Sequence, residues 1–185
     1  MCDFDGELRD LGPMPQDLLA PLDARLAEDP GLWLRADMSK PNRFGVFQGT
    51  TLHIVFQYPL TRESHEQSRY ADLWPGWEGV LRPVIQRAVE PYEYPGGRTT
   101  RIMLARLLAG KAIGAHVDGS PSAEVPHKIH VPLTTNHGVR FTIGDGEHHL
   151  ERGRAYEVNN RRRHAVVNRG AEDRVHLIFD YYDAG

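Results

Sequence analysis

Short runs in which apolar and polar residues alternate fill the second half of this 185-residue chain. Successive side chains of a β-strand point to opposite faces, so the alternation predicts strands with one apolar face. Glycine, asparagine and aspartate separate the runs, as is typical of turns. The strands predicted in this way cover residues 102–108, 128–133, 139–143, 148–150, 155–158, 165–168 and 174–179. So many short strands indicate an antiparallel sandwich or barrel.

The chain before the first of these strands has a mixed pattern. Leucines at positions 18, 19, 22 and 26 recur at helical spacing and predict a helix, although Pro21 opposes it. Apolar positions between residues 80 and 89 predict a second helix. Apolar runs at 44–47 and 52–56 predict a β-hairpin. This part therefore supplies helices as well as strand.

The length suits one domain with one sizeable core. We expect a single domain over residues 1–185, with a mixed N-terminal part at 1–97 and a β-rich part at 98–185 that carries the functional site. The fold class is then mainly β, with the N-terminal helices packed on one outer face of the sheet.

Two of the predicted strands have a basic face. Ile129, Val131 and Leu133 share one face, whereas Lys128 and His130 occupy the other. The last strand opposes its apolar residues with Arg174, His176, Ile178 and Asp180. Either the basic face lies in water, or it lines the interior of a barrel whose outer face packs under helices. An interior of this kind would favour an anionic ligand, because arginine binds a carboxylate through two parallel hydrogen bonds.

Composition excludes several classes of protein. The net charge is −3 and the pI about 6.4, unlike the basic balance of a nucleic-acid-binding protein. Cys2 is the only cysteine, so no disulfide can form within the chain. The first residues are acidic and lack the apolar stretch of a secretory signal, and no run approaches the ~20 apolar residues of a membrane span. We expect a cytoplasmic protein without nucleic-acid or membrane partners.

A candidate metal site lies in the segment GAHVDG. His116 and Asp118 are two residues apart and project to the same side of an extended backbone, and His164 follows 46 residues later. Two imidazoles and one carboxylate form the facial triad of non-haem iron(II) oxygenases, which leaves coordination positions open. A closed structural zinc site would leave none. The adjacent pair His148-His149 is rejected, because neighbouring residues of a strand face opposite ways.

The order of motifs around these residues is more specific than HxD alone. His116-Val117-Asp118 is followed by Lys128-Ile129-His130-Val131-Pro132-Leu133, then by the run from Gly153 to Asn160, and then by His164 and Arg174. This arrangement resembles the aspartyl/asparaginyl β-hydroxylase family over roughly residues 101–181. The first hundred residues match no motif of the family.

The resemblance implies a double-stranded β-helix (a jelly roll, cupin-like) that uses iron(II), 2-oxoglutarate and dioxygen. It implies that His116, Asp118 and His164 form the catalytic metal site. The best-known animal members lack a carboxylate at the position of Asp118, and its presence here completes the triad. It further implies that Arg174 grips the distal carboxylate of 2-oxoglutarate and that His130 also contacts it. Lys128, where the family often has arginine, is expected to be a third contact.

The activity implied is hydroxylation of an unactivated carbon in an amino-acid unit, either an aspartyl- or asparaginyl-like residue of a peptide or a free amino acid. Arg161, Arg162 and Arg163 precede His164; they either form a solvated turn or line the entrance for an acidic substrate. Two alternatives remain open. One is a cupin-like metalloprotein that uses manganese, zinc or nickel without 2-oxoglutarate, and the other is a ligand-binding or sensing module on the same fold. The sequence leaves the oligomeric state open.

Overall fold

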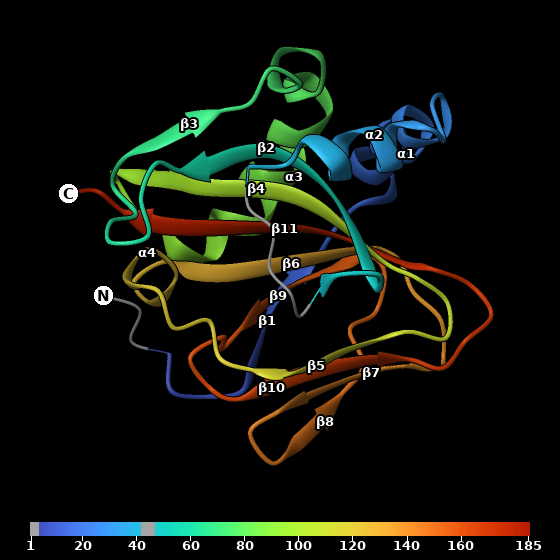
Figure 1. Ribbon diagram of the computed structural model, residues 1–185. Coiled ribbons are helices and arrows are strands. Elements are labelled where there is room, and N and C mark those ends of the chain that lie inside the picture. The colour runs from blue at the N-terminus through green and yellow to red at the C-terminus, as the bar shows by residue number, and fades with distance from the viewer. Residues whose placement is uncertain (1–3, 42–46) are drawn as a thin grey trace.

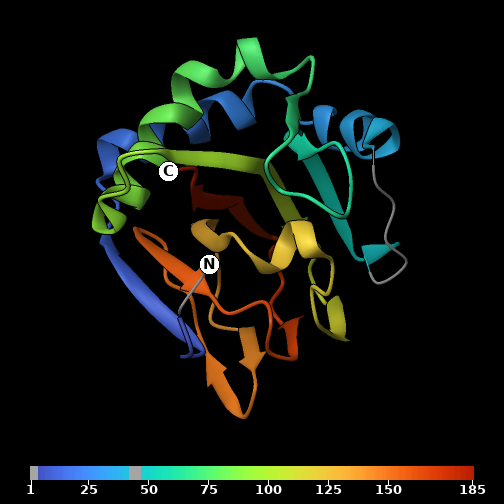
Figure 2. The same cartoon turned by 90° about the vertical axis from the view of Figure 1, so that its left-hand side faces the viewer.

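Two antiparallel β-sheets face each other, and helices cover the outer surface of the larger one (Figures 1 and 2). The computed structural model describes residues 4–41 and 47–185. The seven-stranded sheet has the order β1-β9-β6-β11-β4-β2-β3, and the four-stranded sheet has the order β5-β10-β7-β8. This arrangement confirms the mainly β, jelly-roll fold with helices on one outer face that the sequence predicted.

The elements of the larger sheet come from both halves of the chain. Its strands are β1 (Leu8–Pro13), β2 (Thr51–Pro59), β3 (Ser68–Tyr70), β4 (Gly97–Leu107), β6 (His127–Thr134), β9 (Arg154–Val158) and β11 (Arg174–Asp183). Those of the smaller sheet are β5 (Ala112–His116), β7 (Val139–Ile143), β8 (Gly146–His148) and β10 (His164–Asn168). The helices are α1 (Gln16–Ala27), α2 (Leu32–Ser39), α3 (Glu78–Val89) and α4 (Pro121–Glu124), with short 3₁₀ turns at Trp74–Gly76 and Glu90–Tyr92.

Six of the seven strands predicted in the second half are present, whereas the one predicted at 148–150 shares only His148 with β8, which precedes it. Both predicted helices form as α1 and α3. Each of these helices contains a proline, Pro21 or Pro83, and packing of the apolar face compensates for the lost backbone hydrogen bond. The second arm of the predicted hairpin lies in β2, whereas most of its first arm, with Phe44 and Val46, lies outside the described residues. The sequence did not predict β1, β3, β5 or α2.

The main core lies between the helices and the outer face of the large sheet. The apolar faces of β6 and β11, which include Val131 and Leu177, pack here against Leu19 and Leu22 of α1 and Leu81 of α3. All five side chains are fully buried. The predicted orientation of these strands is therefore confirmed, and the outer face is the apolar one.

The two halves of the sequence share this sheet. Strand β1 pairs with β9, and β2 pairs with β4, so the first 97 residues contribute strands as well as covering helices. Within residues 4–41 and 47–185, no helix combines the length and apolar character needed to cross a bilayer.

The inner face of the large sheet carries the basic residues, arranged in rows across neighbouring strands. In one row Arg101 of β4, Asp180 of β11 and Lys128 of β6 are direct register partners. In the next row the inward residues are Met103, Ile178 and His130. The interior interpretation of the basic face is thus confirmed, and the solvent interpretation is wrong.

Candidate active site

A cavity of about 330 Å³ opens between the two sheets. It collects all six residues that the sequence singled out. These are His116, Asp118, Lys128, His130, His164 and Arg174. Within it Arg174 is almost completely buried, at 2% exposure, whereas Val117, next to two of the candidate metal ligands, is 47% exposed. The cavity therefore has a deep end and a mouth.

The three candidate metal ligands converge in this cavity. His116 ends β5, His164 begins β10, and the two are direct register partners, with ring centroids 4.3 Å apart. Asp118 follows two residues after His116, and its Oδ1 lies 3.6 Å from His116 Nε2. One donor atom from each of the three residues lies within 4.8 Å of the others. Such a spacing allows one ion to contact all three.

Backbone carbonyl groups fix the orientation of both imidazoles. His116 Nδ1 lies 2.8 Å from the carbonyl oxygen of Gly114, and His164 Nδ1 lies 2.9 Å from that of Arg162. A hydrogen bond to a carbonyl requires Nδ1–H, which leaves the Nε2 lone pair of each ring free. Burial lowers the pKa of His164, which keeps its ring neutral and able to bind a metal.

The two oxygens of Asp118 have different surroundings. Oδ1 faces His116, whereas Oδ2 lies 3.5 Å from Lys128 Nζ and accepts a hydrogen bond of 3.4 Å from Asn160 Nδ2. The backbone N–H of Asp118 also donates to the carbonyl of Asn160. Burial alone would raise the pKa of the Asp118 carboxyl, but Lys128 and the two histidines hold it below its ordinary value. Asp118 is therefore ionised at neutral pH.

At the deep end, Arg174 is a buried cation without a carboxylate partner among the described residues. Its Nη2 lies 2.8 Å from His176 Nδ1, its guanidinium stacks 4.9 Å from the centre of the Phe141 ring, and its Nε has no hydrogen-bond partner. His130 is in the same group, with its Nδ1 3.3 Å from that of His176. Burial lowers the pKa of Arg174 to about 9, so the group remains charged at neutral pH.

Lys128 is also buried, but it is paired. Its Nζ donates to Asp180 Oδ1 at 2.7 Å and lies 3.5 Å from Asp118 Oδ2. Arg101 Nε approaches the other oxygen of Asp180 at 3.6 Å. Lys128 thus differs from Arg174, because its charge is already compensated within the protein.

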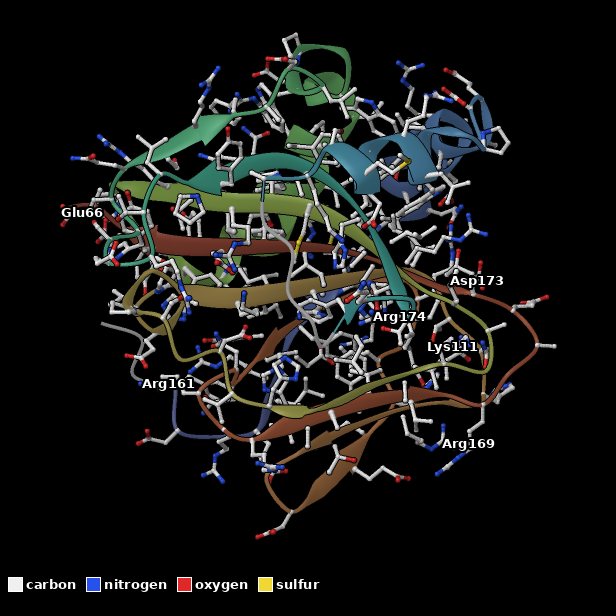
Figure 3. All side chains as sticks on the ribbon, in the orientation of Figure 1. Glu66, Lys111, Arg161, Arg169, Asp173 and Arg174 are labelled. Carbon is white, nitrogen blue, oxygen red and sulfur yellow. The ribbon has the colours of Figure 1, made fainter. Side chains whose placement is uncertain are left out.

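The segment Arg161–Arg163 does not line the cavity. Arg161 donates to the carbonyl of Phe4 and Arg162 to that of Asp5. Both side chains therefore hold the N-terminal segment in place by hydrogen bonds. Figure 3 shows Arg161 at the edge of the molecule and Arg174 between the sheets. The entrance role expected for these arginines is therefore wrong.

Other residues line the cavity that sequence reasoning did not single out: His53, Tyr58, Arg62 and Arg101. The first three lie in β2 and in the loop after it, before the part of the chain that resembles the family, and Arg101 lies in β4, at the start of that part. His176 contacts Arg174 and lies on the same face of β11. The alternation of apolar and polar residues in this strand therefore already indicated that the two side chains are neighbours.

The profile of a known family matches this part of the chain. The model described as aspartyl/asparaginyl beta-hydroxylase covers residues 82–184, which is more than half of the chain and includes the whole cavity-lining set from Arg101 onward. The chain belongs to the aspartyl/asparaginyl beta-hydroxylase family. As a member of this hydroxylase family it is an oxygenase that uses iron(II), 2-oxoglutarate and dioxygen. No curated protein matches the sequence.

Several solved structures share the fold of this beta-hydroxylase family member. One is a 2OG-Fe(II) oxygenase family oxidoreductase from Burkholderia pseudomallei, with 16% identity over 90% of this chain and 88% of that one, and a TM-score of 0.59. Another is a prolyl-4-hydroxylase from Pseudomonas putida, with 14% identity over 98% and 95% of the two chains and a TM-score of 0.55. At these identities the likeness shows the fold alone.

The residues present fit the two groups that the family uses. Two imidazoles, each with its Nε2 free, and one carboxylate whose donor atoms lie close together are the donor set that non-haem iron(II) oxygenases use. A buried guanidinium with an unpartnered Nε fits a carboxylate, since leaving either charge alone in the interior is unfavourable. The residues of the cavity therefore fit an iron(II) ion at the triad and a carboxylate at Arg174.

Proposed function

We propose that His116, Asp118 and His164 hold the iron(II), and that Arg174 and His130 bind the distal carboxylate of 2-oxoglutarate, in an enzyme that hydroxylates an amino-acid unit. The observation that carries this proposal is that one cavity holds both a triad of metal donors and a buried, uncompensated arginine. The expectation that Lys128 also contacts 2-oxoglutarate stays a prediction, and its pairing with Asp180 supports a different role, argued below.

Each group of residues has a separate task. When bound, iron(II) with 2-oxoglutarate supplies the oxidising chemistry that hydroxylates an unactivated carbon. His116, Asp118 and His164 present their donors from one side and leave the other side open. Arg174 fixes one end of the co-substrate through charge and geometry. Apolar lining residues such as Met103, Ile113 and Val166 exclude water from the space between.

The charge of the cavity supports an acidic or amide-bearing substrate. Five cationic side chains line it against one carboxylate, that of Asp118. Lys40 and Lys128 have partners in Asp37 and Asp180, and Arg174 is assigned to 2-oxoglutarate. Arg101 lies 3.6 Å from Asp180, so among the described residues Arg62 is the lining cation without a carboxylate contact, and it would face an aspartyl- or asparaginyl-like residue, free or in a peptide. This assignment replaces the segment Arg161–Arg163 as the basis for an acidic substrate.

A cupin-like metalloprotein without 2-oxoglutarate, or a ligand-binding module, explains less of the site. Neither requires Arg174 to be buried without a carboxylate beside the metal donors. A charge in that position destabilises the fold unless an anion accompanies it. The arrangement therefore favours the 2-oxoglutarate-dependent hydroxylase.

The test begins with anaerobic addition of iron(II) and 2-oxoglutarate. We expect a visible charge-transfer band from chelation of the 2-oxo acid, and we expect His164→Ala to lose it together with metal binding. Succinate formation is then measured with aspartyl, asparaginyl, prolyl and neutral non-amino-acid compounds. Absence of the band in the wild-type protein would contradict the co-substrate. Stimulation by neutral compounds, and not by acidic or amide compounds, would contradict the substrate class.

A further inference from the structure

The surroundings of Lys128 suggest a task that differs from co-substrate binding. Its ammonium group lies between two carboxylates, with Nζ 2.7 Å from Asp180 Oδ1 and 3.5 Å from Asp118 Oδ2. Asp180 is completely buried and Lys128 is 6% exposed. We propose that Lys128, held by Asp180, is a positioning residue that orients Asp118 so that only Oδ1 is presented to the metal. This inference rests on the metal site of the proposed function.

The contacts of Asp118 support this assignment. Its Oδ2 contacts Lys128 and accepts a hydrogen bond from the side-chain amide of Asn160. Its Oδ1 faces His116. A carboxylate held in this way binds a metal through one oxygen. Coordination through both oxygens would take a position that 2-oxoglutarate or dioxygen needs, since three of the six positions of the facial triad must stay open.

Asp180 explains why the lysine does not simply compete with the metal for Asp118. A lysine without another partner would place a full positive charge against Oδ2 and reduce the affinity of the carboxylate for a cation. Here the shorter contact is to Asp180, and the contact to Asp118 is 0.8 Å longer, from 3.5 Å against 2.7 Å. Lys128 therefore directs Asp118 while most of its charge is compensated elsewhere.

The sheet itself holds this arrangement. Asp180 and Lys128 are register partners on the adjacent strands β11 and β6, and Arg101 is the partner of Asp180 on the other side, on β4. Arg101 Nε lies 3.6 Å from the second oxygen of Asp180. Three hydrogen-bonded strands therefore fix Asp180, which fixes Lys128. The geometry of Asp118, which is on a loop, is thus set by a rigid sheet.

The experiment measures the binding of Mn(II) alone, by the loss of its free EPR signal, together with thermal unfolding of the metal-free protein. Lys128→Met is expected to raise the Mn(II) dissociation constant about 10- to 100-fold, the usual effect of losing a residue that orients a metal ligand. Lys128→Arg is expected to recover most of the affinity, because the charge returns. Lys111→Met is the matched control; this lysine is exposed on the turn before β5 (Figure 3), and its loss should leave Mn(II) binding unchanged.

A double variant separates orientation of Asp118 from support of the fold. Lys128→Met leaves the buried carboxylate of Asp180 with only the longer contact to Arg101 and is expected to lower the unfolding temperature. Lys128→Met with Asp180→Asn removes that charge, and should regain unfolding temperature while Mn(II) binding stays weak. If the double variant regains both, or if Lys128→Met binds Mn(II) as the wild type does, the positioning role is wrong.

Two further measurements complete the test. At saturating metal, the affinity of Lys128→Met for 2-oxoglutarate is expected to equal that of the wild type; a large loss there would make Lys128 a co-substrate ligand and overturn the positioning role. His164→Ala tests the metal site itself. If His164→Ala binds Mn(II) as the wild type does, the proposed function fails, whatever Lys128 does.

Discussion

Arg174 is the side chain that we propose selects 2-oxoglutarate as the co-substrate. It is buried, charged and without a carboxylate partner among the described residues, and its guanidinium is held by His176 and Phe141. The neighbouring histidines add no further positive charge, because burial and Arg174 itself keep the pKa of His130 and of His176 well below the ordinary value. An anion that enters the deep end therefore meets a permanent and directional cation.

Arg174→Ala is expected to weaken 2-oxoglutarate binding while metal binding changes little. Leaving the distal carboxylate buried without its partner costs about 3 to 5 kcal/mol by analogy with broken buried ion pairs. This corresponds to a loss of affinity of at least about a hundredfold. Arg174→Lys should recover part of the loss, since charge returns without the planar pair of donors. The measurement is a 2-oxoglutarate titration of succinate formation in the three proteins; equal affinity in wild type and Arg174→Ala would contradict the anchor.

At the residue level the sequence predicted the candidate metal ligands better than it predicted the ion pairs between buried side chains. His116, Asp118, His164 and Arg174 stand in a recognisable order, and the structure brings them into one cavity. Asp180 shares a strand face with Arg174. Six residues of strand separate them by ~20 Å, so Asp180 cannot reach Arg174 and pairs with Lys128 on the next strand. Strand register, which alternation does not reveal, decided this pairing.

At the level of elements, the turns that join β6 to β7 and β10 to β11 brace each other. The side chain of Asn136 donates to Asn168 Oδ1 and to the carbonyl of Glu172, and the backbone N–H of Arg169 donates to the carbonyl of Gly138. A Cβ on Gly138 would lie 2.5 Å from the backbone nitrogen of Gly170. The two backbones can therefore approach this closely because Gly138 has no side chain.

Gly138→Ala is accordingly expected to destabilise the protein by about 1 to 3 kcal/mol, as overpacking against backbone usually does. Gly79→Ala is the matched control, since the same methyl group at the start of α3 meets nothing within 4 Å. There the substitution should stabilise by about 0.5 to 1 kcal/mol, because alanine favours helix over glycine. Urea unfolding of both variants measures the difference. Equal free energies of unfolding for Gly138→Ala and wild type would show that the two turns can separate without cost.

The elements that the sequence missed have physical reasons for being missed. β1 exposes residues on both faces and is held mainly by pairing with β9, so it lacks a clear alternation. α2 follows Pro30-Gly31, which ends one helix and was not expected to precede another so closely. β5 contains Gly114 and is mostly exposed. Apolar patterns thus predict the elements that bury a face, and not those fixed by pairing at an edge.

At the level of the whole molecule, the cavity concentrates histidines that the fold keeps neutral. His53 is 6% exposed and lies on the inner face of β2, next to Asp37 and Lys40 and facing Arg174. Burial first, and then the charge of Lys40, lower the pKa of His53 to about 4 despite the opposing effect of Asp37. His130 and His176 are shifted in the same direction. The interior therefore favours the binding of anions and keeps these three histidines neutral at pH 7.

This arrangement makes the free energy of unfolding depend on pH. The folded pKa of His53 lies below the value of 6.5 that it has when unfolded, so between pH 6.5 and about 4 the unfolded chain binds a proton that the folded chain does not. The contribution of His53 to the free energy of unfolding, on the order of 3 kcal/mol, is therefore fully present above pH 6.5 and is lost as the pH falls toward 4. His53→Gln is expected to reduce the difference between the free energies of unfolding measured with urea at pH 7 and at pH 4.5, without abolishing it, because His130 and His176 remain.

Replacing the exposed His137 by glutamine should leave that difference unchanged. If His53→Gln loses as much stability on acidification as the wild type, then His53 is protonated in the folded protein, and the neutral interior inferred for this end of the cavity is wrong.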